Sequence, residues 1–175
     1  MTAPTWSVRR VHALDDAQID ELATVLIDCV EGGASVSFMH PLSRDRAVAF
    51  WRRVAHGVAA GERALIIAED AQGLCGTVQL VLDQPENQPH RAELSKMLVH
   101  RRARRQGLGA ALMRAAEAAA RECGKTLLVL DTANDEAERL YERLGWTRVG
   151  VIPDYALLPH GGLCGTTVYY RNLAS

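Results

Sequence analysis

The chain has 175 residues, of which 48% are hydrophobic and 23% are charged, and its formal net charge is −1. These values are typical of a globular protein, so they exclude a disordered chain and give no electrostatic reason to expect nucleic acid or a membrane surface as a partner. The length predicts a single domain over residues 1–175, and the lack of a basic start followed by an apolar run predicts a cytoplasmic protein without a signal peptide.

A short strand and two helices open the chain. The strand is predicted over Ser7–Val11. The first helix begins at Asp15-Asp16 and ends at Gly32-Gly33, with apolar residues recurring along one face. Ser43 caps the second helix, which ends by Gly61. Both helices therefore have an apolar side.

The segment between these helices, residues 34–41, is predicted to be a loop. Its side chains at Val36, Phe38 and Met39 look exposed. Apolar side chains gathered at one exposed place indicate an interface or a lid, so we expect either a homodimer contact or a mobile cover over a site here.

Three strands follow. Residues 63–69 and 74–82 are predicted to form a hairpin around the turn at Asp70–Gly73. A polar, proline-containing loop over residues 83–89 then leads to a strand over residues 92–99.

The second half of the chain alternates helices and strands. A helix is predicted from Gly107 to Cys123, a strand over Thr126–Leu130, and a helix from Asn134 to Leu144. Two last strands, residues 146–152 and 166–170, are joined by a loop rich in proline and glycine. The run Leu127–Leu130 is wholly apolar, which predicts a central strand buried on both faces.

The junction between the strand ending at Val99 and the following helix has the character of an anion site. The first N–H groups of a helix have no partner inside it, and they carry the positive end of the helix dipole. Gly107 and Gly109 leave room for a phosphate to contact the backbone, while Arg104 and Arg105 offer charged, forked donors. This junction therefore predicts a phosphate-binding loop.

A second motif begins the helix at Asn134. Ala137 and Tyr141 are four residues apart and therefore lie on one face of that helix, which Gly145 ends before Trp146. Asn134 can cap the helix and still offer its amide to a ligand. The alternative is a purely structural helix with a buried tyrosine.

Two carboxylates lie where a charge needs a partner or a chemical role. Glu93 is inside the strand that leads to the phosphate loop, and Asp131 follows the apolar strand. The structural alternative pairs Glu93 with Lys96 or with an arginine of a neighbouring strand, and lets Asp131 cap the next loop.

The two motifs, Arg-x-x-Gly-x-Gly and Asn-x-x-Ala-x-x-x-Tyr-x-x-x-Gly-Trp, resemble the signatures of the GNAT acyl-CoA N-acyltransferases, and the order of strands and helices agrees over nearly the whole chain. The resemblance implies the GNAT fold. This is an α/β fold with flanking helices and a mixed, mostly antiparallel central sheet that is splayed between its fourth and fifth strands.

The resemblance also implies acetyl-CoA as co-substrate, with no metal. A backbone N–H near Leu98 or Val99 would stabilise the thioester carbonyl, and Tyr141 would protonate the departing thiolate. Cofactor-binding residues carried over from the family are Met97, Leu98, Val99, Arg104, Arg105, Gln106, Gly107, Leu108, Gly109, Ala110, Asn134 and Ala137.

The family chemistry gives the carboxylates a role, because only the neutral form of an amine attacks a thioester. A carboxylate can take the extra proton directly or through water. Glu93 is the preferred base, while Asp131 binds the substrate ammonium or shares that role.

Further segments resemble a subgroup of the family that acetylates β-lactam toxins. They imply substrate contacts at Phe38 and Tyr155. The segments that carry this resemblance include Gly32–Val36, Arg91–Glu93, Leu130–Thr132 and Thr147–Gly150; the chain departs from the subgroup at residues 40–47, 83–89 and 160–162.

The expected activity is therefore transfer of an acetyl group from acetyl-CoA to the amine of a small molecule. The alternatives are a protein or peptide amine as acceptor, and a non-catalytic acyl-CoA-binding module.

The basic run His100–Arg105 is better explained by CoA phosphates than by nucleic acid, with Arg101 and Arg102 simply solvated. The cysteines form no Cys-x-x-Cys pair, so we expect free thiols rather than disulfides or metal ligands.

Overall fold

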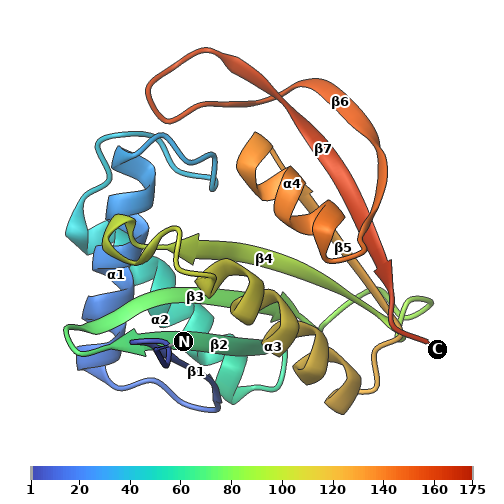
Figure 1. Ribbon diagram of the computed structural model, residues 1–175, viewed down its shortest axis with the longest axis horizontal. Coiled ribbons are helices and arrows are strands. Elements are labelled where there is room, and N and C mark those ends of the chain that lie inside the picture. The colour runs from blue at the N-terminus through green and yellow to red at the C-terminus, as the bar shows by residue number, and fades with distance from the viewer. Residues whose placement is uncertain (1, 175) are drawn as a thin grey trace.

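The computed structural model describes residues 2–174 (Figure 1). The predicted order of strands and helices and the mixed α/β fold are confirmed. The elements are β1 (Ser7–Val11), α1 (Asp16–Glu31), α2 (Arg44–Ala59), β2 (Arg63–Asp70), β3 (Gly73–Val81), β4 (Arg91–Val99), the 3₁₀ helix η1 (Arg101–Ala103), α3 (Leu108–Glu122), β5 (Leu127–Thr132), α4 (Asp135–Arg143), β6 (Thr147–Leu157) and β7 (Leu163–Asn172).

The seven strands form one sheet in the order β1-β2-β3-β4-β5-β7-β6. Every neighbouring pair is antiparallel except β4 and β5, which run parallel. These two strands pair only from Arg91 opposite Leu127 to Glu93 opposite Val129. Beyond Glu93 they separate, as Figure 1 shows, so the predicted splay is confirmed.

A β-bulge in β4 lies just beyond this separation. Thr77 of β3 pairs with Leu98, whereas Gln79 pairs with Ser95, so β4 carries one extra residue between the two pairs. Lys96 lies in that interval and has a left-handed backbone with φ of 52°. The bulge re-aims the backbone and side chains of β4 where the sheet opens.

Helices cover both faces of the sheet (Figure 1). One core joins α3 and α4 to alternate residues of β2 to β5 and includes Ile66, Leu94, Leu128 and Tyr141. The other joins α1 and α2 to the opposite face and includes Trp51. Within the described residues, no helix has the combination of length and apolarity needed to cross a bilayer.

Two sequence predictions about strands are wrong. Strand β5 is interior, but Leu127 and Val129 are only half-buried, because α1 and α2 pack over β2 to β4 and cover that face of β5 incompletely. Much of the predicted loop after Ile152 is strand. Pro153 has no N–H for the ladder, and β6 accommodates it by an irregularity between Ile152 and Ala156 before pairing resumes.

Candidate functional site

A cavity of about 370 Å³ lies where β4 and β5 separate. Its walls come from five segments: the end of α1 with the following loop, the end of β4, the start of α3, the end of β5, and α4. Most of the predicted cofactor-binding residues line it, namely Met97, Leu98, Val99, Arg104, Arg105, Gly107, Leu108, Gly109, Ala110, Asn134 and Ala137, together with Tyr141.

The phosphate-loop motif forms the turn into α3. Arg105 and Gly107 both have positive φ, at 59° and 77°, and Gly107 is the N-cap of the helix without a capping side chain. A side chain at Gly107 would meet no atom within 4 Å, whereas one at Gly109 would meet Leu140 of α4 at 3.1 Å. Gly107 therefore keeps the helix N-terminus open, and Gly109 permits close packing of α3 against α4.

The arginines of the basic run His100–Arg105 have two different roles. Arg101 and Arg102 are not simply solvated, so that prediction is wrong. Arg101 binds Asp28 through its backbone N–H at 3.0 Å and through its side chain. Arg102 donates two hydrogen bonds to Asp70, at 3.1 and 3.2 Å. These two arginines anchor the loop, while Arg104 and Arg105 line the cavity. Arg104 is held there by a hydrogen bond from its Nε to the Val99 carbonyl at 3.1 Å, which keeps its positive charge at the cavity wall.

Sequence reasoning missed Asp28 and Asp70 as positioning residues. Asp28 lies among the apolar residues of α1, and only 10% of its side chain is exposed. A carboxylate in such a place needs a partner, so it could have been recognised from the helix pattern. Gln106, predicted to contact the cofactor, instead donates to the Arg102 carbonyl at 3.2 Å and is absent from the cavity wall.

Asp70 gives a pH-dependent prediction. Its hydrogen bond from Arg102 lowers its pKa below the ordinary 3.8. The pair therefore stabilises the fold above that value, and the contribution is lost as the pH falls through the lowered pKa. Asp70→Asn should lower the free energy of unfolding by about 1–2 kcal/mol near neutral pH. The deficit relative to wild type should shrink at acidic pH, as the pH falls below 3.8.

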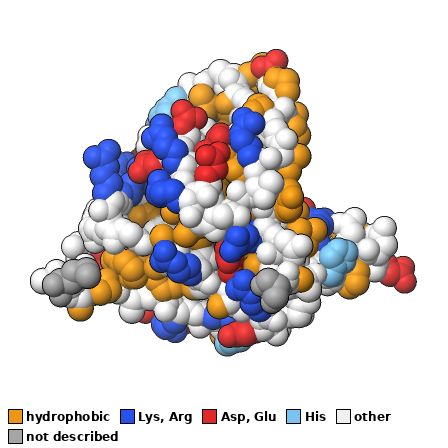
Figure 2. Space-filling model, turned by 45° about the vertical axis from the view of Figure 1, so that its right-hand side comes forward, with side chains coloured by type: hydrophobic (Ala, Val, Ile, Leu, Met, Phe, Trp, Pro, Cys, Tyr) orange, Lys and Arg blue, Asp and Glu red, His pale blue; other side chains and the backbone are white. Residues whose placement is uncertain are grey.

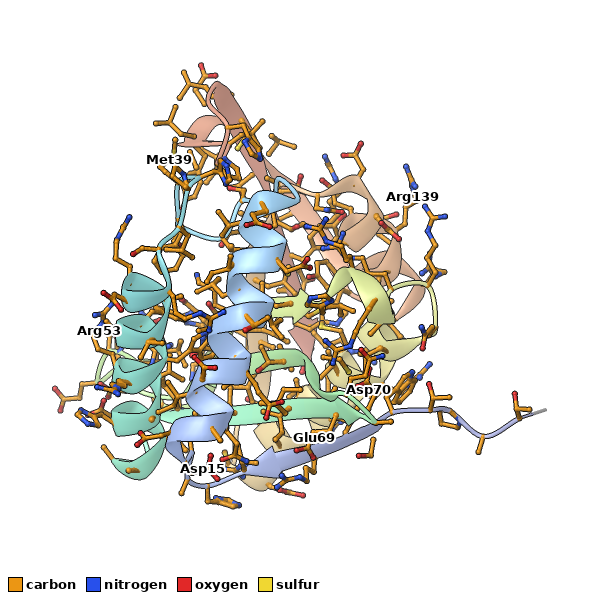
Figure 3. The ribbon with its side chains drawn as sticks, turned by 90° about the vertical axis from the view of Figure 1, so that its left-hand side faces the viewer. Asp15, Met39, Arg53, Glu69, Asp70 and Arg139 are labelled. Carbon is orange, nitrogen blue, oxygen red and sulfur yellow. The ribbon has the colours of Figure 1, made fainter. Side chains whose placement is uncertain are left out.

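Urea unfolding at both pH values measures this effect. Glu69→Gln is the matched control, because Glu69 is the neighbouring residue at the end of β2 (Figure 3) and its ion pair with Arg9 is exposed. An equal deficit at both pH values would contradict the assignment to the Asp70 charge.

Helix α4 presents the second motif to the cavity. Asn134 Oδ1 accepts the Ala137 N–H at 2.9 Å, so the predicted cap forms and the amide nitrogen remains free to face a ligand. Tyr141 is 4% exposed and its ring packs against Trp146 and Tyr169, with centroids 6.0 and 5.8 Å away. Burial, and then the charge of Asp131, raise the pKa of the Tyr141 phenol well above 10.0. The phenol is therefore a proton donor near neutral pH.

The two candidate bases lie outside the cavity wall in different surroundings. Both residues are exposed. Glu93 accepts a hydrogen bond from Arg91 of the same strand at 3.0 Å, rather than from Lys96 or a neighbouring strand. Asp131 accepts a hydrogen bond from Thr166 at 2.7 Å. After burial, the charge of Asp131 is the second cause of the raised pKa of Tyr141, and it opposes the lowering of the Lys96 pKa by burial. The charge of Asp131, unlike that of Glu93, therefore acts on Tyr141 and Lys96.

The loop between α1 and α2 is partly packed rather than fully exposed. Val36 and Phe38 are half-buried, and only Met39 keeps the expected exposure, at 42%. Phe38 packs edge-on against Phe50 with centroids 5.3 Å apart. Tyr155, the other predicted substrate contact, is 55% exposed on β6 and is absent from the cavity wall.

The same loop contacts the turn between β6 and β7. His40 donates its backbone N–H to the Pro159 carbonyl at 2.9 Å, and the rings of His40 and His160 lie 4.5 Å apart. Figure 3 shows Met39 beside this turn. The two loops therefore meet on one side of the site.

Charge on the surface is mixed rather than uniformly positive. On the face shown in Figure 2, basic and acidic side chains are interspersed.

Comparison with known proteins agrees with this arrangement. The model of the acetyltransferase (GNAT) family matches residues 26–146, more than half of the chain.

Three solved structures illustrate the structural similarity, which at these identities establishes the fold alone. A phosphinothricin acetyltransferase from Sinorhizobium meliloti, solved with acetyl-CoA, is 18% identical over 97% of this chain and 89% of that one, with a TM-score of 0.80. A ribosomal-protein-alanine N-acetyltransferase from Brucella melitensis is 18% identical over 95% and 99%, also with a TM-score of 0.80. A GCN5-related N-acetyltransferase from Kribbella flavida is 23% identical over 96% and 98%, with a TM-score of 0.77.

Proposed function

Because the chain belongs to the acetyltransferase (GNAT) family, we propose that it transfers an acetyl group from acetyl-CoA to the amine of a small, amino-acid-like molecule. The single observation that carries the proposal is the cavity itself. It brings together the open helix N-terminus at Gly107, the end of β4 beyond its bulge, and the buried phenol of Tyr141.

The residues present fit acetyl-CoA. The turn at Arg105–Gly107 and the N-terminus of α3 suit a pyrophosphate, and Arg104 adds a cation. Ala137 leaves room along α4 for a narrow chain, and the bound thioester would supply the acetyl group and a thiol leaving group.

We assign the proton transfers to two side chains. Asp131 accepts the proton of the acceptor ammonium, and Tyr141 donates its phenolic proton to the leaving sulfur. A backbone N–H near Leu98 stabilises the developing oxyanion. Both carboxylates are exposed, but Asp131 takes precedence because its charge acts on Tyr141, whereas Glu93 is paired with Arg91.

A small acceptor is favoured by the contact between the α1–α2 loop and the β6–β7 turn, because these loops would narrow the path for a polypeptide. The phosphinothricin acetyltransferase among the similar structures supports an amino-acid-like toxin as acceptor. The sequence resemblance to the subgroup that acetylates β-lactam toxins, to which the tabtoxin resistance protein belongs, supports the same acceptor class. The similarity to a ribosomal-protein-alanine N-acetyltransferase makes a protein amine the second candidate acceptor.

A thiol-release assay tests the proposal. The purified protein is mixed with acetyl-CoA and a panel of amino acids, amino-acid-like toxins, polyamines and peptides. We expect turnover on amino acids or their analogues. Turnover restricted to peptides would move the assignment to the protein acceptor, and binding of acetyl-CoA with no turnover on any amine would overturn the catalytic proposal.

Three wider properties complete the proposal. The catalytic unit is the whole chain, residues 1–175, because β1 and β6 are the two edges of one sheet.

A cytoplasmic location is supported by four free cysteines. A homodimer is supported by the exposed apolar side chains of edge strand β6, such as Val149 and Val151 at 65% and 52% exposure, and sedimentation of the full chain would test it.

A further inference from the structure

Lys96 is a half-buried cation at the edge of the site that the acetyl-transfer chemistry does not use. It lies in the β4 bulge, and its ammonium donates to the Ser37 hydroxyl at 3.0 Å. The same nitrogen lies 5.9 Å from the centre of the Phe50 ring, within the range of a cation–π contact. An ammonium has three donors, so this one retains capacity for a further acceptor.

The backbone holds this contact in place from both sides. Ser37 and Lys96 are non-glycine residues in the left-handed region, with φ of 77° and 52°. Such conformations are unfavourable for side-chain-bearing residues and gather at functional sites. Ser37 also directly follows Val36, which lines the cavity, so the contact borders the place where an acceptor would enter.

The charges around Lys96 suit an anion that belongs to the acceptor. Burial lowers the pKa of Lys96, and Asp131 acts in the opposite direction, yet among the described residues no ion pair within 4.0 Å joins the two. Arg63 adds a second positive charge that acts on Lys96. A separated ammonium and carboxylate are complementary to a molecule that carries one acid group and one amine.

We propose that Lys96 is an anion subsite that binds the acid group of a zwitterionic acceptor, while the acceptor amine lies at Asp131. This inference rests on the proposed function, because the subsite binds the acceptor of that reaction. It restricts the acceptor to molecules with an oxyanion, such as a carboxylate, near the reacting amine. Phe38, packed on Phe50, would border the same group.

Matched pairs of acceptors test the subsite. Each pair consists of an amino acid and its primary amide, which differ in the charge of the acid group and in the pKa of the neighbouring amine. The acid-to-amide ratio of kcat/KM is therefore compared between wild type and variants at one pH, where the difference in amine pKa cancels. For wild type, kcat/KM should favour the acid by about tenfold or more, as expected for a charge-assisted hydrogen bond. In Lys96→Met the preference should disappear through a higher KM for the acid, with kcat/KM for the amide unchanged. Lys96→Arg should retain part of the preference.

Arg53→Met is the control, because Arg53 is an exposed cation on α2 (Figure 3) and its loss removes the same charge away from the site. Equal loss of activity toward acid and amide in Lys96→Met, or no preference in wild type, would overturn the subsite. The chain has only two lysines, Lys96 and Lys125, so peptide mapping by mass spectrometry after incubation with acetyl-CoA shows whether Lys96 is itself acetylated. Acetylation of Lys96 would also overturn the subsite.

Calorimetry of the same pairs with the CoA-saturated protein separates the subsite from catalysis. Acids that bind wild type but not Lys96→Met, without turnover, would sustain the subsite and reject the proposed function. Turnover of amines without selective binding of acids would sustain the proposed function and reject the subsite.

Discussion

Tyr141→Phe should lower kcat by about 10²- to 10³-fold, because it removes the group assigned to protonate the leaving sulfur. The substitution deletes one hydroxyl and keeps the ring that packs against Trp146 and Tyr169, so the fold should be retained. Burial and Asp131 raise the pKa of the phenol above 10.0, so Tyr141 remains a proton donor throughout the neutral range. Any fall in activity on the acidic side should therefore come from another group.

Single-turnover kinetics and direct titration with acetyl-CoA check this expectation. The dissociation constant for acetyl-CoA should stay unchanged, because the other cavity residues remain. Tyr170→Phe is a suitable control, since Tyr170 is 39% exposed on β7 and its hydroxyl loss should leave kcat intact. A weaker affinity for acetyl-CoA with normal kcat would assign Tyr141 to binding instead.

Asp131→Asn should cause the second largest loss of activity, with kcat/KM lowered by about 10²-fold. The acceptor amine has an ordinary pKa of about 10 and needs a base near neutral pH. The deficit should therefore shrink as the pH rises toward that value, because the amine then loses its proton to solvent. Glu93→Gln should cost far less, since Glu93 is exposed and Arg91 retains its bonds to Gln84 and Gln88.

Profiles of kcat/KM against pH for both variants decide between the two carboxylates. Thr166→Val tests the support of Asp131, because it removes the hydroxyl that donates to the carboxylate at 2.7 Å. Its effect should be smaller than that of Asp131→Asn. A larger deficit in Glu93→Gln, with the same dependence on pH, would return the role of base to Glu93.

The anchored arginines show where sequence reasoning stopped. The run His100–Arg105 has five basic side chains that are equivalent in the sequence, yet in the structure they have different partners. Asp28 and Asp70 are more than 30 residues away along the chain and reach Arg101 and Arg102 only after α1 and β2 have packed beside the loop. Such partners cannot be recognised from spacing, because they depend on which faces of distant elements meet.

Local chemistry explains what the sequence did determine. Helical periodicity, capping at Ser43 and Asn134, and the glycine that opens α3 are decided within a few residues, so they could be predicted together with the order of strands and helices. Three features were decided by tertiary structure. They are the opening between β4 and β5, the extension of β6 through Pro153 with the matching extension of β7, and the contact of the two loops at His40 and Pro159. The placement of Lys96 against Ser37 and Phe50 belongs to that second group, because it requires a bulge in one strand and a loop 59 residues earlier to meet.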